Sequence, residues 1–411
     1  MSKLVSSRRD YFVKGVNALM GQSAKWQDMN YHPPVPAEAP ISIKIATTKK
    51  EKERVYRFRY QVYVEEMGKL LSADADHKHR MLFDELDEWG ILFYATVGRK
   101  IIGTMRLNVG SVNDFPPEYI EAFAMDKFQT FSCTSFPEHK LTFTSKTMVA
   151  PQYRRSQAFY LLSATLYETI RKIGGQFNFT GGAPHMVALY EQLGHRRYKS
   201  NFQIPDYGYM VPMVILMEDI NHLRQVRSPM WRLARKFENS PESADWFTRT
   251  FPEATRYINK QMIDREMLLQ LISDKLERQP NSINLFMGMS ESEARLCAEV
   301  GHIFLCHQAE TIIQPSDMSH EFFVVLSGCV AVRKRHGLKF RQTVLHSGQC
   351  FGERSFVTHS RHNVSVIAQT DTELLIMPRH GLERLQIQHP ETAAKLLHNI
   401  GIRVSHTYNY A

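Results

Sequence analysis

The chain has 411 residues, of which 43% are hydrophobic and 23% charged, and a formal net charge of +9. This composition is that of a globular protein with room for two to three domains. No run approaches the roughly 18 apolar residues of a membrane-spanning helix, and the N-terminus lacks the apolar core of a secretory signal. The positive charge favours an acidic partner: a carrier protein, a nucleic acid or a membrane.

Five scattered cysteines bear on the compartment. They are Cys133, Cys297, Cys306, Cys329 and Cys350. They form no CxxC or Cys/His spacing and their number is odd, which indicates a reducing, cytoplasmic setting and argues against structural zinc. We therefore expect no metal.

Residues 1–40 are predicted to form an N-terminal arm. A short amphipathic turn is expected from Tyr11 to Met20 beside basic residues, followed by a stiff proline linker between Pro33 and Pro40. Docking on the body or fraying is the favoured interpretation, and peripheral membrane contact through this turn is the alternative.

Residues 41–218 are predicted to form the first domain, in which helices interleave with a larger number of strands. The hydrophobic periodicity predicts strands at 41–48, 89–97, 100–107, 141–149, 176–180 and 211–217, and helices at 49–66, 157–172 and 184–193. Gly98-Arg99 is typical of a hairpin turn. This order of elements indicates an α/β or α+β sheet domain.

Residues 219–282 are expected to form a helical connector, and residues 283–411 a second domain. In that domain a helix at 290–300 is followed by short strands separated by glycines, which is typical of a small β-roll. A closing helix is predicted at 383–399. The predicted fold class of the whole chain is α+β.

The strand–turn–helix at 141–172 is the first candidate for function. A turn at Gln152–Ser156 would aim backbone N–H groups and the positive end of the helix dipole at a ligand. The positive charge makes a phosphate or pyrophosphate the expected ligand, and the candidate residues for binding it are Val149, Arg154, Arg155 and Ser156. The alternative is an ordinary turn with solvated arginines.

Three motifs occur in order between residues 55 and 200. They are Arg59–Tyr63, then Asp84–Asp87 followed by Gly103–Leu107, and finally Tyr190–Arg197. Together they resemble the GNAT acyltransferase superfamily, and within it the branch of acyl-homoserine-lactone synthases and long-chain N-acyl amino acid synthases. The resemblance implies that an amine attacks an acyl thioester, donated by acyl-CoA or acyl carrier protein, and that the thiol leaves.

The resemblance suggests roles for five residues. Asp84 and Asp87 are three apart, so on one turn their carboxylates would face together and hold a substrate ammonium; a solvated acidic loop is the alternative. Arg59 and Arg106 would bind a substrate carboxylate or anchor the acidic pair. Tyr190 is at the position of the GNAT general acid, although a helical tyrosine facing a sheet is otherwise a core residue.

Two departures from the family pattern change these expectations. The turn that cradles pyrophosphate is usually glycine-rich, but here Arg154–Phe159 contains no glycine, which weakens the case for acetyl-CoA. The strand reads Phe143–Lys146 where the lactone-synthase branch has E-x-S-R, so a carboxylate is missing and lysine replaces arginine. The predicted catalytic residues are Tyr190, Asp87 and Lys146. The general base stays open between a water relay, Asp87 and a substrate deprotonated in solution.

The C-terminal segments Glu310–Ile313, Phe322–Val332 and Ser347–Glu353 resemble cyclic nucleotide-binding domains over about residues 283–400. The resemblance implies that Glu353, beside Gly352, binds the ribose hydroxyl.

The residue that would hold the cyclic phosphate is ambiguous. The family places an arginine nine or ten residues after the glutamate, but His362 lies at the nine-residue spacing and Arg361 one residue earlier, on the opposite face of a strand. Arg361 in the pocket would make a sensor of cAMP or cGMP. His362 there would make a weak, pH-dependent site or a degenerate, structural domain.

Three functions follow as alternatives. The leading prediction is an N-acyltransferase that moves a fatty acyl group from carrier protein or CoA to a small amine, with an amino acid as the expected acceptor. The second is a protein lysine acetyltransferase gated by cyclic nucleotide, and the third is a catalytically inactive GNAT shell kept as a regulatory binding module. An apolar tunnel beside Phe93, Met105 and Phe143 would favour the first, and an open groove the second.

Nucleic acid is not expected as a partner. The chain stops at Ala411, soon after the closing helix, with no room for a helix-turn-helix. The oligomeric state does not follow from the sequence.

Overall fold

The structure of the protein is a computed structural model that describes most of the chain. The described residues are 40–68, 74–131, 140–154, 156–204, 208–277, 285–315, 317, 319–336, 339–358 and 360–409. The expected N-terminal arm, apart from its last residue, therefore lies outside the described residues, and so do Cys133 and Arg155.

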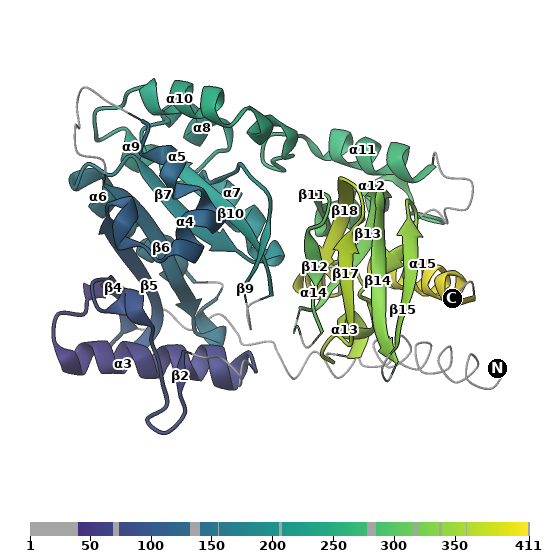
Figure 1. Ribbon diagram of the computed structural model, residues 1–411, viewed down its shortest axis with the longest axis horizontal. Helices are drawn as coiled ribbons and strands as arrows, with labels where there is room; N and C mark the ends of the chain where they lie inside the picture. Colours follow the sequence, from purple (N-terminus) through teal and green to yellow (C-terminus); the bar gives the residue numbers. More distant parts are fainter. Residues whose placement is uncertain are drawn as a thin grey trace.

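An eight-stranded sheet forms the centre of the first domain (Figure 1). Its strands lie in the order β1-β4-β5-β6-β7-β10-β8, with β9 paired to β10, and only β6 and β7 are parallel neighbours. The bounds are β1 (Ser42–Ile45), β4 (Ile91–Val97), β5 (Lys100–Gly110), β6 (Leu141–Val149), β7 (Phe177–Gly182), β8 (Arg196–Arg197), β9 (Phe202–Ile204) and β10 (Gly208–Leu216). The hairpin expected between β4 and β5 is present, and Gly98 turns it at φ +57°.

Helices cover both faces of this sheet. Helix α3 (Lys49–Tyr60) continues as a π-helical turn at Gln61–Glu66 and packs on one face, whereas α6 (Ala158–Lys172) packs on the other. Alternate residues of β4 separate the two cores, because Leu92 contributes to the core with α3 and Phe93 to the core with α6. The other elements of this domain are β2 (Ala75–Asp76), β3 (Met81–Leu82), η2 (Glu85–Asp87), η3 (Val112–Asp114), α4 (Pro117–Phe123), α5 (Met125–Phe128), η4 (Pro151–Tyr153), η5 (Pro184–Met186) and α7 (Val187–Leu193).

An aromatic cluster fills the face of the sheet opposite α6. Phe128 is central to it, with ring centroids 4.7 Å from Phe179 and 5.0 Å from Phe251. Phe143 belongs to this cluster, whereas Phe93 and Met105 belong to the core beneath α6. The three residues considered for an acyl tunnel are therefore buried in two cores on opposite faces of the sheet. A tunnel along either face would not be lined by all three.

Strand β6 is irregular in its second half. Its parallel pairing with β7 runs from Leu141–Phe177 to Thr144–Thr180, while β6 continues along β5 to Val149. A register shift against β5 falls at Lys146, which adopts φ +50°. An extra residue in one strand with left-handed backbone is a β-bulge, a device that bends a strand away from its neighbour. The two central parallel strands therefore separate after Thr144.

Helices at the top of Figure 1 link the sheet domain to the second domain. They are α8 (Ile220–Gln225), α9 (Trp231–Ala234), α10 (Glu242–Thr250), η6 (Pro252–Arg256) and α11 (Arg265–Glu277).

The second domain is a β-roll of two four-stranded sheets, β11-β18-β13-β16 and β12-β17-β14-β15. Its strands are β11 (His302–Cys306), β12 (Thr311–Ile313), β13 (Glu321–Ser327), β14 (Cys329–His336), β15 (Lys339–His346), β16 (Cys350–Phe351), β17 (Val364–Ala368) and β18 (Thr372–Pro378), and its helices are α12 (Glu291–Val300), α13 (Glu353–Thr358), α14 (Arg379–Gln388) and α15 (Pro390–Asn409). The α+β class is confirmed.

The prediction of one closing helix at 383–399 is wrong. Two helices, α14 and α15, meet at His389, which has φ −143° and ψ 69°. Pro390 disfavours helical backbone in the residue before it and itself suits the first position of a new helix.

The two domains share a buried polar interface. Tyr209 of β10 donates to a carboxylate oxygen of Glu310 at 2.9 Å, and the Asn201 side-chain amide donates to both Glu310, at 3.1 Å, and the Leu305 carbonyl, at 3.0 Å. Arg197 of β8 reaches the Ile303 carbonyl at 3.0 Å. These contacts join the edge of the eight-stranded sheet directly to β11 and to Glu310, the residue before β12 of the β-roll.

Candidate functional site

The Asp84–Asp87 motif forms a self-capped 3-10 turn. The Asp84 carboxylate accepts from the Leu86 N–H at 3.0 Å, and the Asp87 carboxylate accepts from the Asp84 N–H at 3.0 Å. This reciprocal arrangement is a capping box, which the three-residue spacing makes accessible. The turn fixes both carboxylates toward the sheet.

Two arginines from different elements meet these carboxylates. Arg59 of α3 lies 2.8 Å from Asp87, and Arg106 of β5 lies 2.9 Å from Asp87 and also pairs with Asp84. Arg59, Arg106 and Asp87 are almost completely buried. Asp87 is thus a partner of two protein cations and is not exposed to an incoming substrate.

Lys146 extends the network to the bulge of β6. Its ammonium lies 2.9 Å from Asp84 and 2.7 Å from Asp74. Burial alone would raise the pKa of the Asp84 carboxyl, but Lys146 and Arg106 outweigh that effect and lower it to about 2. Asp84 is therefore ionised at neutral pH.

An open, acidic pocket of about 550 Å³ borders this network. Its lining includes five carboxylates and the aromatic rings of Phe83 and Tyr119, and the charged members are Asp74, Asp76, Asp84, Glu85 and Glu118. Glu85 and Glu118 have no ion-pair partner among the described residues. Tyr119 packs edge-on against Phe143 of β6, with the ring centroids 5.2 Å apart. The lining residues Tyr119 and Asp84 therefore connect the pocket to Phe143 and Lys146 of β6.

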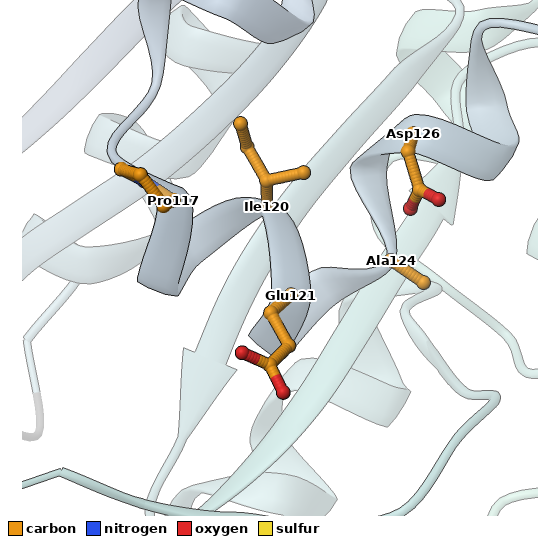
Figure 2. Close-up of a pocket in the computed structure, with 5 residues that line it drawn as sticks. All are labelled: Pro117, Ile120, Glu121, Ala124 and Asp126. Atoms are coloured by element: carbon orange, nitrogen blue, oxygen red, sulfur yellow. The ribbon is translucent and has the colours of Figure 1, made fainter.

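A second hollow of about 410 Å³ lies along α4 and the start of α5 (Figure 2). The residues drawn there are Pro117, Ile120, Glu121, Ala124 and Asp126, and the two carboxylates do not converge on one point. No residue proposed from the sequence lines it.

Tyr190 lies where β6 and β7 separate. It projects from α7, which ends at Gly194 with φ +113°, and it is buried among the hydroxyls of Thr147 on β6 and Thr180 on β7. Burial raises the pKa of the Tyr190 phenol above its ordinary value, while the two threonine hydroxyls act in the opposite direction. The phenol is thus protonated at neutral pH, as a general acid requires.

Space for the Tyr190 ring comes from Gly182 at the end of β7. A Cβ atom there would lie 3.2 Å from the ring. Since Lys146 and Thr147 are consecutive, the ion-pair network and the tyrosine lie on the two sides of one bulge in β6.

The turn before α6 is occupied by its own side chains. Arg154 donates to the Val149 carbonyl at 3.2 Å and pairs with Glu66 of the π-helical turn. The Ser156 hydroxyl donates to the Tyr153 carbonyl at 2.7 Å and accepts from the N–H of Ala158, the first residue of α6, at 3.2 Å. Both residues are at the helix N-terminus, as expected, but are engaged with the protein.

In the β-roll, Gly352 has φ +85° and Glu353 begins α13. His362 is buried, and its Nε2 lies 3.0 Å from both the hydroxyl and the carbonyl of Ser319. Arg361 is exposed. Burial lowers the pKa of His362, so that this side chain is neutral at neutral pH.

Sequence reasoning missed part of the acidic pocket. Asp74, Phe83, Glu118 and Tyr119 belong to no motif and come from three separate segments. The density of acidic residues between Asp74 and Glu88 was the available signal. It did not show which carboxylates remain unneutralised.

Comparisons with known proteins identify both domains. Residues 58–164 match the family model of the acetyltransferase (GNAT) domain, and residues 306–389 match that of the cyclic nucleotide-binding domain. The chain therefore combines a GNAT acetyltransferase domain with a C-terminal cyclic nucleotide-binding domain.

Individual relatives match each part. The cyclic AMP receptor protein of Thermus thermophilus is 29% identical over 114 residues, which are 27% of this chain and 53% of the relative. The chain thus spans about half the length of the curated relative it matches. A cyclic nucleotide-binding domain from Methylobacillus flagellatus is 17% identical with a TM-score of 0.32, over 36% of this chain and 80% of that structure.

FeeM, an N-acyl amino acid synthase from uncultured soil microbes, is 10% identical with a TM-score of 0.36, over 47% of this chain and 99% of that structure.

Among the described helices of the present chain, none is both long and apolar enough to cross a bilayer.

Proposed function

We propose that this protein is an N-acyltransferase that moves an acyl group from a thioester donor to the amine of a small molecule, with an amino acid as the expected acceptor. The observation that carries the proposal is the separation of β6 and β7 with Tyr190 between them and an acidic pocket on the other side of the same bulge. A donor and an acceptor then approach one point from two directions.

The donor would lie along β6 beyond Thr144. A strand whose parallel neighbour has turned away presents backbone groups that can bind the amides of a pantetheine arm. Acyl-CoA and acyl carrier protein both carry this arm, and the net charge of +9 suits an acidic carrier protein. Arg154, Arg155 and Ser156 at the following turn remain the proposed contacts for the donor's phosphates.

The acceptor ammonium would enter the acidic pocket. Five carboxylates favour a cation there, and the rings of Phe83 and Tyr119 provide faces for it. Asp84, with a pKa of about 2, is too weak a base to take the ammonium proton at neutral pH. We infer that this proton leaves to water through the open pocket. Asp84, in the pocket lining, would orient the acceptor rather than deprotonate it, and Asp87 and Lys146 would hold Asp84 in place.

The chemical step then follows from the geometry. The amine nitrogen attacks the thioester carbonyl, the C–N bond forms, the C–S bond breaks, and Tyr190 gives its proton to the departing thiolate. The nitrogen then loses its second proton to water, which leaves a neutral amide, and the Tyr190 phenolate takes a proton back from water. Arg59 and Arg106 hold the acidic turn in place during this step, because both are buried against it.

A second candidate is acetyl transfer to a lysine side chain. It is favoured by the openness of the pocket and by the burial of Phe93, Met105 and Phe143 in two separate cores, which leaves no common channel for a long acyl chain beside them. Lysine ammonium suits the same acidic lining.

The C-terminal domain would regulate either reaction, with cAMP or cGMP as a weakly bound ligand. We place the protein in the cytoplasm, since Cys297, Cys306, Cys329 and Cys350 are free thiols.

The test is thiol release from purified full-length protein. Acetyl and long-chain donors, as CoA and carrier-protein thioesters, are combined with an amino-acid panel and with lysine peptides. We expect release with one donor class and its loss in Glu118→Gln, which removes an unpaired pocket charge from an exposed position. The control is Glu65→Gln, an exposed carboxylate outside the pocket that pairs with Arg80. Absence of release with every donor would refute catalysis and favour the inactive regulatory module.

A further inference from the structure

The turn that leads into α7 is held by the other domain. His185 lies in η5, between β7 and α7, and its Nδ1 is 3.6 Å from a carboxylate oxygen of Glu321, the first residue of β13. Its ring also packs edge-on against His380 of α14, with centroids 5.9 Å apart. Two elements of the β-roll therefore contact the residue five positions before Tyr190.

Glu321 is poorly placed for a purely structural carboxylate. It is 5% exposed, and its Oε2 atom has no hydrogen-bond partner among the described residues. Burial alone would raise the pKa of the Glu321 carboxyl, but the contact with His185 and then the neighbouring His320 outweigh that effect and lower it. The carboxylate is thus ionised in an interface of imidazoles, where removing its charge changes what holds His185.

The same residue is packed against the nucleotide-binding segment. A Cβ atom on Gly352 would lie 2.7 Å from the Glu321 carbonyl, so this glycine permits a direct backbone approach. The preceding loop is bound to α13, because the Ser355 hydroxyl donates to the Ser319 carbonyl at 2.5 Å and His320 lies 3.1 Å from the same hydroxyl. A shift of α13 is therefore transmitted to Glu321.

On the acyltransferase side the path to the site is short. Gly182, at the end of β7, contacts the Tyr190 ring, and η5 is the connection between them. Any displacement of His185 moves the start of α7 relative to β7. The distance between the Tyr190 phenol and the hydroxyls of Thr147 and Thr180 depends on the position at which α7 starts.

We propose that Glu321 is a positioning residue for Tyr190, and that through the Glu321–His185 contact the nucleotide-binding segment at Gly352 and α13 controls acyl transfer. The expected effect on kcat rests on the proposed function, whereas the expected effect of Glu321 on the position of α7 does not. The Glu321–His185 contact is thus a route of coupling between two sites in one chain, with each site acting on the same η5 turn.

Kinetics of Glu321→Gln in the full-length protein test the first half. Because the substitution keeps the side-chain shape and removes the charge, we expect kcat to fall by about tenfold, a fraction of the 10²–10⁴ that a general acid contributes, with the KM for the donor unchanged. In a Tyr190→Phe background the same substitution should have no further effect. His185→Gln, at a partly exposed position, should reproduce the loss. The matched control is Arg256→Gln, which removes an exposed ion pair to Asp371 between the connector and the β-roll.

Hydrogen exchange tests the structural half without any acyl transfer. We expect faster amide exchange in residues 183–193 for Glu321→Gln and His185→Gln, and wild-type exchange for Arg256→Gln. Wild-type exchange in both interface variants would overturn the proposal, whatever the activity. A kcat loss of equal size in the Tyr190→Phe background would show that Glu321 does not act through Tyr190. Absence of thiol release in wild type with altered exchange would refute the proposed function alone.

Discussion

Arg106→Ala should destabilise the first domain strongly. The Arg106 guanidinium is completely buried, pairs with Asp84 and Asp87, and donates to the Ser145 hydroxyl at 3.0 Å. Truncating it leaves two carboxylates in the interior with one cation each, Lys146 for Asp84 and Arg59 for Asp87.

The magnitude follows from burial. Removing one partner of a buried ion pair costs about 3–5 kcal/mol, and the remaining cations place this site at the lower end. A loss of about 3 kcal/mol lowers the melting temperature of a domain of this size by roughly 6–12 °C. The control is Arg80→Ala, because Arg80 pairs with Glu65 at the surface and is 63% exposed; its loss should cost less than about 1 kcal/mol.

The pH dependence supplies a second signature. The pKa of Asp84 is lowered from 3.8 to about 2 in the folded protein, so its contribution to stability is fully present above about pH 4 and is lost as the pH falls through about 2. Without Arg106 this shift shrinks, so the gap between wild-type and variant melting temperatures should narrow between pH 4 and pH 2. Equal melting temperatures for Arg106→Ala and Arg80→Ala at pH 7 would refute this account of the network.

Three further outcomes are expected. Tyr190→Phe should lower kcat about 10²- to 10⁴-fold with little change in melting temperature, and a turnover close to wild type would exclude Tyr190 as the acid. Because His362 is neutral at neutral pH, millimolar cAMP should leave the melting temperature unchanged at pH 7.5 but raise it in His362→Arg; a clear shift in the wild type would contradict the inward position of His362. Tyr209→Phe should cost about 1–3 kcal/mol by leaving the half-buried Glu310 short of a donor. Calorimetry should then show the two domains melting further apart, whereas an unchanged transition would mean that the interface contributes no coupling.

Local sequence patterns predict much of the fold. The alternation in 141–149 and the apolar spacing after Gln157 predicted β6 and α6 nearly to the residue, because each has one face on the core and one clear stop signal. The prediction of one closing helix is wrong because the apolar periodicity continues across Pro390, whereas the helix itself is interrupted there. Spacing also placed Asp84 and Asp87 on one turn, and the sequence motifs brought Arg59 and Arg106 near them.

The sequence could not show which charged side chains pair with one another. Asp87 and Asp84 were considered as carboxylates for a substrate, but Arg59, Arg106 and Lys146 arrive from three other elements and neutralise them. Glu85 and, far along the chain, Glu118 are the pocket carboxylates without an ion-pair partner among the described residues. Interdomain contacts such as His185–Glu321 were equally inaccessible, since they join residues 136 positions apart with no shared motif.

The extra residue at Lys146 also decides which side of the sheet the rest of β6 serves. In a regular strand Thr147 would point the same way as Ser145, toward Arg106 and the acidic turn. With one residue inserted, Thr147 points instead to Tyr190, and Met148 joins the core beneath α3. Deleting Lys146 would remove the bulge and restore a regular strand in which Thr147 and Met148 keep their present faces. The deletion would instead remove the bend that separates β6 from β7 and the ammonium that pairs with Asp84, so it would alter the site while leaving the two cores facing the same side chains.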